Sequence, residues 1–574
     1  TSDKIENKNH TETALAFGNA TGGYQLQNNR YTIVYGDVLL YYDKNLTDKI
    51  NLSAYAGWSG RKEKSYNLNS YTVDGLSVEN WFNLNASKST PRTGMDEINL
   101  LKTAWYGDVT LSYDNWAYLE GTLRNEKSST LYMDNNSFWY PSVNASVVFS
   151  ELLKEKKPTW LDYGKIRASY GIVGLAPEIY AATVAYNQGT ASGYVYNEQP
   201  MAVGNNGIKP ERTYEWEFGL EGKFLNNRAG FDLSYYSKDV KDQILRTTTA
   251  SSTGGTSILM NVGEYTSKGV ELELYGTPYM TKDWRIDVRG NIAWNWNKIK
   301  KLADGVERLE HKRWDNGAAY LYSMVGGSIG DFYAYAPKED AQGNKIVGSD
   351  GFYELTSEPV KVGNTMPKYT GGFGFTVTYQ NVYLDVSLDY RCGGSVFNMP
   401  YEYMMGRGSL TENMEYRDAD HGGQTYYLGS DNMPVAASTA PTGKTLYDDG
   451  IILPGVKEDG TKNDIMISAD RMYNWTYNWG TEAPTYYSHS IFKNSYVKVR
   501  EIVLGYNFPK SIISKFGCQK LQLSAYARNP FYIYKNLPIF DAEATDATSW
   551  IEQSWIGGST VTTRSFGVSL RVSF

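Results

Sequence analysis

Apolar and polar residues alternate with a period of two along much of this 574-residue chain. The alternation is clearest in the last nine residues, where apolar side chains stand at every second position: Phe566, Val568, Leu570, Val572 and Phe574. A period of two predicts a β-strand with one apolar face and one wet face. We interpret this segment as the strand that closes a β-barrel, with lipid on its apolar face and water on the other.

Charged residues occupy one face of two further alternating segments, 284–296 and 382–391, while Trp, Ile, Val and Leu occupy the opposite face. A dry core could not hold these charges without several kcal/mol of desolvation per ion. A soluble sheet would not show its apolar face to water in strand after strand. Lipid outside and a wet lumen inside satisfy both constraints. We therefore predict that six charged residues face a lumen: Arg285, Asp287, Arg289, Asp385, Asp389 and Arg391.

The same patterning predicts an all-β chain that forms part of a transmembrane antiparallel β-barrel. The fifteen expected strands lie at about 31–42, 47–58, 100–114, 116–127, 139–150, 161–173, 211–224, 229–243, 264–275, 283–296, 369–380, 382–391, 494–506, 519–533 and 561–574. Short and long connections alternate between them, and 59–99 and 392–493 are among the long ones. Short turns on one side and long loops on the other are typical of a barrel in an outer membrane.

The odd number of expected strands suggests that the wall continues before this chain, because bacterial barrels normally have an even number. Residues 1–30 then form an outer loop with the tail of an earlier strand. The start at Thr1-Ser2-Asp3 also suggests that an N-terminal portion is missing.

Composition excludes several functions. The net charge of -7 disfavours a nucleic-acid partner. The four histidines are scattered without ligand spacing, and we find no catalytic motif, so we predict no enzyme, no metal site and no cofactor. Cys392 follows a strand on its long-loop side, and Cys518 lies in a short turn on the other side, so we expect them at opposite rims and unpaired.

The long connection 392–493 is rich in Tyr and Trp. Aromatic faces stack on sugars and on peptide side chains, and binding residues gather on loops that a rigid scaffold carries. We therefore predict substrate-binding residues there: Tyr426, Tyr427, Tyr473, Trp475 and Trp479. The alternative is that these rings pack the loop against itself or against a partner.

Five stretches together resemble one protein family in the order of its motifs. They are Gly204–Thr213 (GNNGIKPERT), Asn261–Leu272 with its Lys268-Gly269-Val270-Glu271, Val325–Tyr333 (VGGSIGDFY), Tyr496–Pro509 (YVKVREIVLGYNFP) and Arg564–Phe566 before the terminal alternation. These stretches are similar to motifs of the SusC/RagA-type TonB-dependent outer-membrane transporters. The resemblance spans about residues 200–574 and is weaker upstream.

The resemblance implies a 22-stranded barrel, a plug and a coupling box. On that expectation residues 1–574 are the C-terminal two-thirds or so of the barrel, without plug or coupling box. It also implies an outer membrane of a Gram-negative bacterium, a SusD-type surface lipoprotein, a TonB-type coupling protein and, in some cases, dimers of transporter–lipoprotein pairs. The expected function is active import of oligosaccharides or oligopeptides, and the aromatic loop favours glycans.

Three alternatives stay open at this point. A siderophore receptor on the same fold would bind an iron chelate tightly. A passive porin or adhesin would let solutes cross without the proton-motive force. A soluble glycan-binding or glycan-cleaving β-protein would stay in water without detergent, although the polar lumen face disfavours it.

Overall fold

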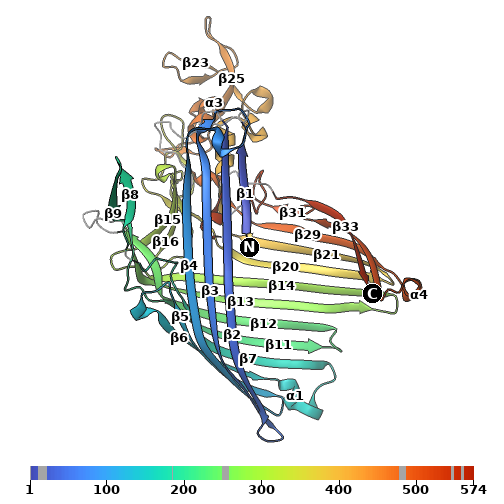
Figure 1. Ribbon diagram of the computed structural model, residues 1–574. Helices are drawn as coiled ribbons and strands as arrows, with labels where there is room; N and C mark the ends of the chain where they lie inside the picture. The colour runs from blue at the N-terminus through green and yellow to red at the C-terminus, as the bar shows by residue number, and fades with distance from the viewer. Residues whose placement is uncertain are drawn as a thin grey trace. The chain divides into compact units, whose positions relative to one another are not determined.

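The computed structural model of this chain describes residues 2–10, 22–183, 185–248, 257–477, 487–544, 549–557 and 562–574. The chain divides into two compact units. Unit 1 holds Thr1–Glu155, Lys165–Phe218 and Lys238–Glu264, and unit 2 holds Lys156–Gly164, Gly219–Ser237 and Tyr265–Phe574. β-Strands dominate both units, so the predicted all-β class is confirmed (Figure 1).

Unit 1 contains a meander in which each strand pairs antiparallel with the next in sequence. The strands are β1 (Ser2–Asn9), β2 (Gly23–Asn45), β3 (Ile50–Leu76), β4 (Ser87–Tyr113), β5 (Ala117–Ser128), β6 (Ser137–Val147) and β7 (Leu161–Leu175). A short helix α1 (Phe149–Leu153) lies between β6 and β7. β1 corresponds to the strand tail expected within residues 1–30.

The expectation of a long loop at 59–99 is wrong. β3 runs on to Leu76, β4 begins at Ser87, and the two stay in register from Ile50↔Tyr113 to Tyr71↔Arg92. The extension is rich in Lys, Glu, Asn, Ser and Tyr on both faces, so no apolar stripe reveals it. Backbone hydrogen bonds between the strands suffice to hold a wet ribbon of this kind.

Later strands of the first half are divided between the units or are short. β8 (Asn187–Ala191) and β9 (Tyr194–Glu198) form a hairpin, and β10 (Ala202–Val203) pairs parallel with the start of β13. β11 (Glu211–Phe224), β12 (Ala229–Thr248) and β13 (Ser257–Met280) contribute residues to both units, as does β7, whose residues 161–164 belong to unit 2.

Unit 2 contains a second antiparallel meander. Its strands, in hydrogen-bonded order, are β14 (Trp284–Lys301), β20 (Pro367–Tyr379), β21 (Val382–Gly393), β29 (Tyr496–Asn507), β30 (Lys520–Arg528) and β33 (Ser565–Ser573). The predicted strand 519–533 is interrupted, because Asn529 takes a left-handed φ of 49° and Pro530 follows it. β31 (Tyr532–Lys535) therefore pairs separately with β29.

The long connections of unit 2 carry small sheets and helices of their own. Two of these sheets have four strands each: β15 (Arg308–Trp314), β16 (Ala319–Met324), β17 (Asp331–Ala334) and β19 (Val360–Asn364) form the first, and β23 (Gln424–Leu428), β24 (Pro434–Ala436), β25 (Leu446–Ile452) and β27 (Met466–Ser468) form the second. A three-stranded sheet holds β22 (Ser395–Asn398), β28 (Ile491–Lys493) and β32 (Trp555–Ile556). A two-stranded sheet holds β18 (Ile346–Val347) and β26 (Val456–Lys457). The helices of these connections are α2 (Met399–Gly406) and α3 (Ala469–Tyr477), whereas α4 (Lys510–Ile513) lies in the short connection between β29 and β30.

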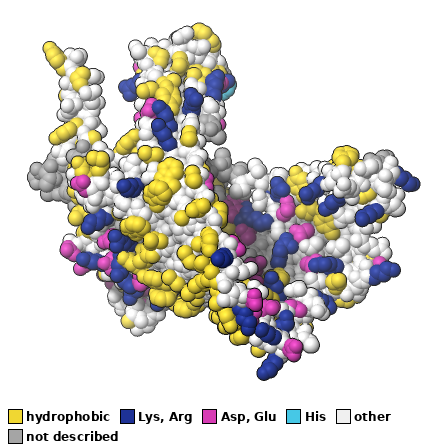
Figure 2. Space-filling view, turned by 60° about the horizontal axis from the view of Figure 1, so that its bottom comes forward, with side chains coloured by type: hydrophobic (Ala, Val, Ile, Leu, Met, Phe, Trp, Pro, Cys, Tyr) yellow, Lys and Arg dark blue, Asp and Glu magenta, His cyan; other side chains and the backbone are white. Residues whose placement is uncertain are grey.

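The apolar faces of the wall strands lie on the surface. In β33, Phe566 and Val568 are each 72% exposed, as expected for a face that meets lipid. Hydrophobic side chains gather in a broad patch on the face drawn in Figure 2. None of the helices in the described part of the chain has the length and apolarity that a membrane crossing demands. No disulfide bond joins Cys392 to Cys518.

Candidate functional site

The polar face of the second meander carries charged side chains that neutralise one another. Strand pairing sets Asp287 opposite Thr376 and Thr376 opposite Asp385, so these three share a face. Arg285 donates to Asp287 at 2.7 Å, and Arg289 donates to both carboxylate oxygens of Asp385 at 3.1 and 3.2 Å. These four charged side chains therefore form two ion pairs.

Asp389 and Arg391 extend the same polar face along β21. Asp389 accepts a hydrogen bond from the Arg500 guanidinium, and Arg391 donates to the Thr365 carbonyl at 2.8 Å. The structure therefore brings all six predicted lumen-facing residues onto one face of neighbouring strands. Their position in a lumen stays a prediction.

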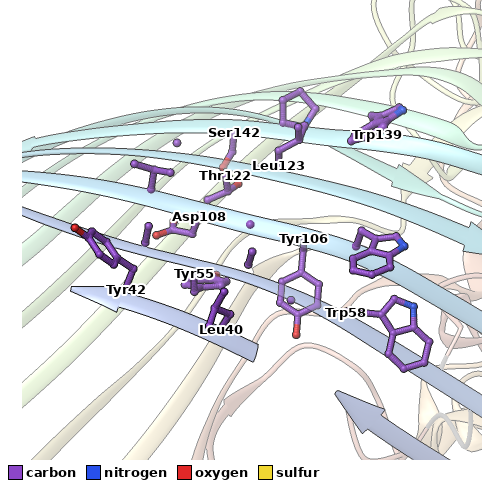
Figure 3. A pocket seen from close by; sticks show the side chains of 18 of the residues that line it. Leu40, Tyr42, Tyr55, Trp58, Tyr106, Asp108, Thr122, Leu123, Trp139 and Ser142 are labelled. Atoms are coloured by element: carbon purple, nitrogen blue, oxygen red, sulfur yellow. Dashed lines mark hydrogen bonds between the residues drawn. The ribbon is translucent and has the colours of Figure 1, made fainter. Parts of the chain in front are cut away.

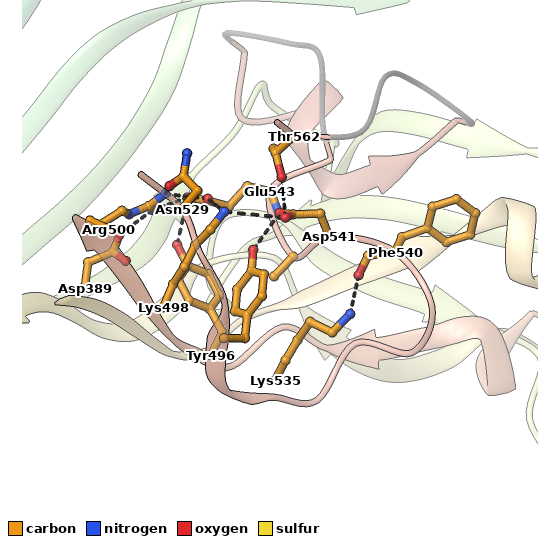
Figure 4. Close-up of polar contacts among 12 residues, drawn as sticks. Asp389, Tyr496, Lys498, Arg500, Asn529, Lys535, Phe540, Asp541, Glu543 and Thr562 are labelled. Atoms are coloured by element: carbon orange, nitrogen blue, oxygen red, sulfur yellow. Dashed lines mark hydrogen bonds and ion pairs between the residues drawn. The ribbon is translucent and has the colours of Figure 1, made fainter. Parts of the chain in front are cut away.

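An ion network ties the segment 536–544 to β29 (Figure 4). We call it the clasp and define it as Lys498 and Arg500 on β29 with Asp541 and Glu543 on the segment. The Lys498 ammonium lies 2.7 Å from Glu543 and 3.4 Å from Asp541, and Arg500 Nη1 donates to Glu543 at 2.7 Å. Tyr532 donates to Asp541 at 2.6 Å. The clasp thereby fixes the segment to the wall through charge and hydrogen bonds together.

Burial makes the clasp energetically consequential. Lys498 is only 1% exposed, and a buried ammonium is costly unless a carboxylate faces it. Burial opposes ionisation of Glu543, but the hydrogen bonds from Arg500 and Lys498 outweigh it and hold the pKa of that carboxyl below its ordinary value. Burial likewise opposes ionisation of Asp541, yet hydroxyl donors Thr562 and Tyr532 lower its pKa. Both carboxylates are therefore charged at neutral pH.

Acid should release the segment 536–544. A carboxyl whose pKa is lowered in the folded state contributes stability in full above its unfolded pKa, and this is lost as pH falls through the folded pKa. For Asp541 and Glu543 that window lies below about pH 4. Limited proteolysis at pH 7, 5 and 3 should show cleavage within 536–544 only at the lowest pH. A protein carrying both Asp541→Asn and Glu543→Gln should be cleaved at every pH, and equal pH dependence in that variant would contradict the explanation.

Sequence reasoning missed the clasp as a site. Lys498 and Arg500 stand at alternate positions within Tyr496–Pro509, one of the five stretches that resemble the transporter family. Asp541 and Glu543 stand at alternate positions in the connection that follows. Two cations and two carboxylates at matching spacing were the available signal, but nothing in the sequence alone pairs them.

Aromatic rings pack the long connections into a core of their own. The aromatic cluster consists of Trp314, Phe332, Phe397 and Tyr487, and three of them, Phe332, Phe397 and Tyr487, are fully buried. Phe397 stacks on Tyr487 at 5.1 Å between ring centroids and meets Trp314 edge-on at 5.3 Å. Tyr487 also donates to Asp315. This core holds segments that are far apart in sequence in one arrangement.

The predicted substrate-binding residues lie in different settings. Tyr426 and Tyr473 are each only 4% exposed; Tyr426 donates to Asp449, and Tyr473 donates to the carbonyls of Glu412 and Glu415. These two rings therefore offer little surface to a ligand.

Trp475 and Tyr427 are half-buried. Trp475 stacks on Phe352 at 4.7 Å between ring centroids. Trp479 lies outside the described residues. A direct substrate contact by any of the five stays a prediction.

A carboxylate is buried between the long connections as well. Glu402 on α2 is 1% exposed, and its Oε2 meets the Nε2 of His489 at 2.7 Å and accepts from the Ser490 hydroxyl. Asn398 caps α2 by accepting from the Tyr401 backbone N–H. The contacts tie α2 to the residues before β28. Within the part of the chain that the structure describes, His, Cys, Asp and Glu side chains form no metal-ligating group of three or more.

Comparison with known proteins gives a family match and several relatives for this chain. Residues 4–430 match the family described as TonB dependent receptor-like, beta-barrel. TonB-dependent receptor P3 of Formosa agariphila is 22% identical over 93% of this chain and 51% of its own length. TonB-dependent receptor SusC of Bacteroides thetaiotaomicron is 26% identical over 42% of this chain and 26% of its own length.

A solved structure of the RagAB peptide transporter shares the fold, with a TM-score of 0.70, at 18% identity, over 100% of this chain and 59% of the other. Two curated relatives match at least 90% of this chain, and the chain spans about half of their length. The predicted barrel fold and outer-membrane location are confirmed. The family consists of transporters, which are not enzymes. The chain belongs to the TonB dependent receptor-like, β-barrel family.

Proposed function

We propose that this chain is the wall of an active importer in the outer membrane. Cargo binds between the long connections and a SusD-type surface lipoprotein. A TonB-type protein then supplies inner-membrane energy that releases the cargo inward. Membership of the TonB-dependent family supports energy coupling, and similarity to SusC and to RagAB supports a transporter of this type.

The single observation that carries the proposal is the paired charge on the polar face of the second meander. The pairs Arg285–Asp287, Arg289–Asp385 and Arg500–Asp389 leave little net field along that face. A surface of this kind neither traps nor repels a large neutral or zwitterionic solute. Oligosaccharides and oligopeptides are solutes of that class.

The two cargo classes draw on different observations. The abundance of Tyr and Trp in 392–493 favours an oligosaccharide, because sugars stack on aromatic faces. Tyr426 and Tyr473 are buried, so these two rings offer little surface on which a sugar could stack. The RagAB relative is described as a peptide transporter, which favours an oligopeptide. We retain the oligosaccharide as the first class to test and the oligopeptide as the second.

Affinity purification of the protein from native outer membrane in mild detergent should recover a surface lipoprotein near one copy per barrel. Mass spectrometry of the eluate identifies the partner and gives its amount from peptide intensities. The matched control is an unrelated outer-membrane barrel carrying the same tag, purified in the same detergent.

A barrel recovered without any lipoprotein would contradict the lid and would favour a passive porin or a siderophore receptor. Recovery in the aqueous fraction without detergent would contradict the membrane wall. Adding an oligosaccharide pool or an oligopeptide pool to the complex, and measuring which raises its melting temperature, then separates the two cargo classes.

A further inference from the structure

The apolar face of unit 1 is hollowed into a trough. Five neighbouring strands, β2 to β6, line a space of about 1240 Å³ whose walls are almost wholly apolar (Figure 3). Leu40 and Tyr42 stand on one side of it, and Leu123 on the other. All three are exposed to the surroundings of the protein.

Small residues form the floor of the trough. Strand pairing sets Ala56 opposite Gly107, and it sets Ala54 opposite Val109, which lies opposite Gly121. A Cβ placed on Gly121 would meet no atom within 4 Å, so the space above it is open. Large apolar residues on both sides of a glycine and alanine floor produce an elongated groove rather than a flat wall.

Tryptophans mark one end of the trough. Trp58 lies opposite Trp105 on paired strands, and Trp139 on β6 reaches the same level through its pairing with Asn125, which lies opposite Trp105. Figure 3 shows Trp58 and Trp139 at one end and Tyr42 at the other. Tryptophan prefers the boundary between the hydrocarbon and headgroup layers. This end is the one that points away from the short turn at 46–49.

A cationic pocket follows on the same face of the same strands. Lys62 lies four residues beyond Trp58 on β3, which is about 13 Å along a strand. Together with Arg30 and Lys64 it lines a space of about 720 Å³. Lys64 pairs with Glu97 at 2.8 Å, whereas Arg30 and Lys62 form no ion pair within the described residues.

We propose that the trough and this pocket together bind one anionic lipid of the outer leaflet. Its acyl chains lie in the trough, and its phosphate-bearing headgroup meets Arg30 and Lys62. Ordinary contact with bulk lipid needs neither an open groove nor unpaired cations. Charge complementarity selects the occupant, because two unpaired cations beyond a tryptophan boundary match the negative headgroup of a membrane lipid.

The test measures lipid binding by the protein extracted from outer membrane and stripped of lipid in detergent. Native mass spectrometry compares phosphatidylglycerol with phosphatidylcholine of identical acyl chains. The parent protein should prefer phosphatidylglycerol by about thirtyfold, as expected for two cations near a headgroup. Arg30→Gln with Lys62→Gln should abolish the preference while leaving binding of phosphatidylcholine unchanged.

A second variant tests the trough independently of charge. Gly121→Leu fills the floor of the trough and should lower the affinity of the protein for both lipids by about tenfold, because the leucine displaces acyl chain and leaves the cations unchanged. Ala525→Leu places the same side chain on β30, which does not line the trough, and should leave the affinity for both lipids unchanged.

Two outcomes would overturn the proposal. Equal affinity for the two lipids in the parent protein would remove the headgroup site. A Gly121→Leu protein that keeps its lipid affinity but no longer associates with a second copy would make the trough an interface between chains. The Gly121→Leu protein should fold, because leucine is favoured over glycine within a strand. If it does not fold, the lipid preference of the protein carrying Arg30→Gln and Lys62→Gln still tests the proposal.

Discussion

Replacing Glu543 by alanine should free the segment 536–544 from the wall. The change removes the carboxylate that both Lys498 and Arg500 contact and leaves the Lys498 ammonium buried without its nearest partner. Breaking a buried pair in this way costs about 3–5 kcal/mol. Hydrogen exchange measured by mass spectrometry should show protection in 536–544 falling by a factor of about a hundred or more.

Glu552→Ala supplies the matched control for this change. Glu552 contacts Lys312 at 2.9 Å and lies in the same connection between β31 and β33, but it is nearly half exposed. An exposed pair contributes about 0–1 kcal/mol, so exchange in 536–544 should stay close to that of the parent protein. Equal effects of Glu543→Ala and Glu552→Ala would show that burial of the clasp does not hold the segment.

Phe397→Ala should loosen the packing of the long connections of unit 2. Phe397 is fully buried between Tyr487 and Trp314, and removing its ring leaves a cavity between them. Truncation of a buried Phe costs about 3–5 kcal/mol. Hydrogen exchange should speed up together in β16, β17 and β28, because all three border the aromatic cluster or are bonded to its strands.

The control for this change is Phe531→Ala. Phe531 precedes β31 and is about half exposed, so its truncation should cost less than about 1 kcal/mol. Exchange in the wall strands β14 and β20 should be unaffected by either variant. Faster exchange across the wall in Phe397→Ala would mean that the long connections and the wall unfold together rather than separately.

The wall strands were predictable because burial there follows a simple rule. A strand with lipid on one face and polar groups on the other must alternate, and the predicted 382–391 corresponds to the observed Val382–Gly393. The extension of β3 to Leu76 was not predictable, because both of its faces are wet and the alternation disappears. The break at Asn529 depends on one left-handed residue and one proline, which hydrophobic periodicity does not register.

In the candidate site, the sequence likewise predicts the face on which a side chain lies but not the partner that it contacts. Arg285, Asp287 and Arg289 could be assigned to one face because strand period alone fixes the side of the sheet on which a residue lies. Their partners could not be assigned, since the pairing of Arg289 with Asp385 joins residues that are far apart in sequence. Tyr426 and Tyr473 show the same limit, because an aromatic composition predicts contact with a ring face but not whether sugar or protein supplies it.

The most direct test of the account is uptake in living cells with the energy supply switched on and off. Mass spectrometry of the periplasm measures oligosaccharides and oligopeptides that accumulate from the medium, in a strain with this protein and in one that lacks it. We expect accumulation that depends on the protein and is abolished when an uncoupler collapses the proton-motive force. Accumulation that needs the protein but survives the uncoupler would contradict an energy-coupled importer and identify a passive channel.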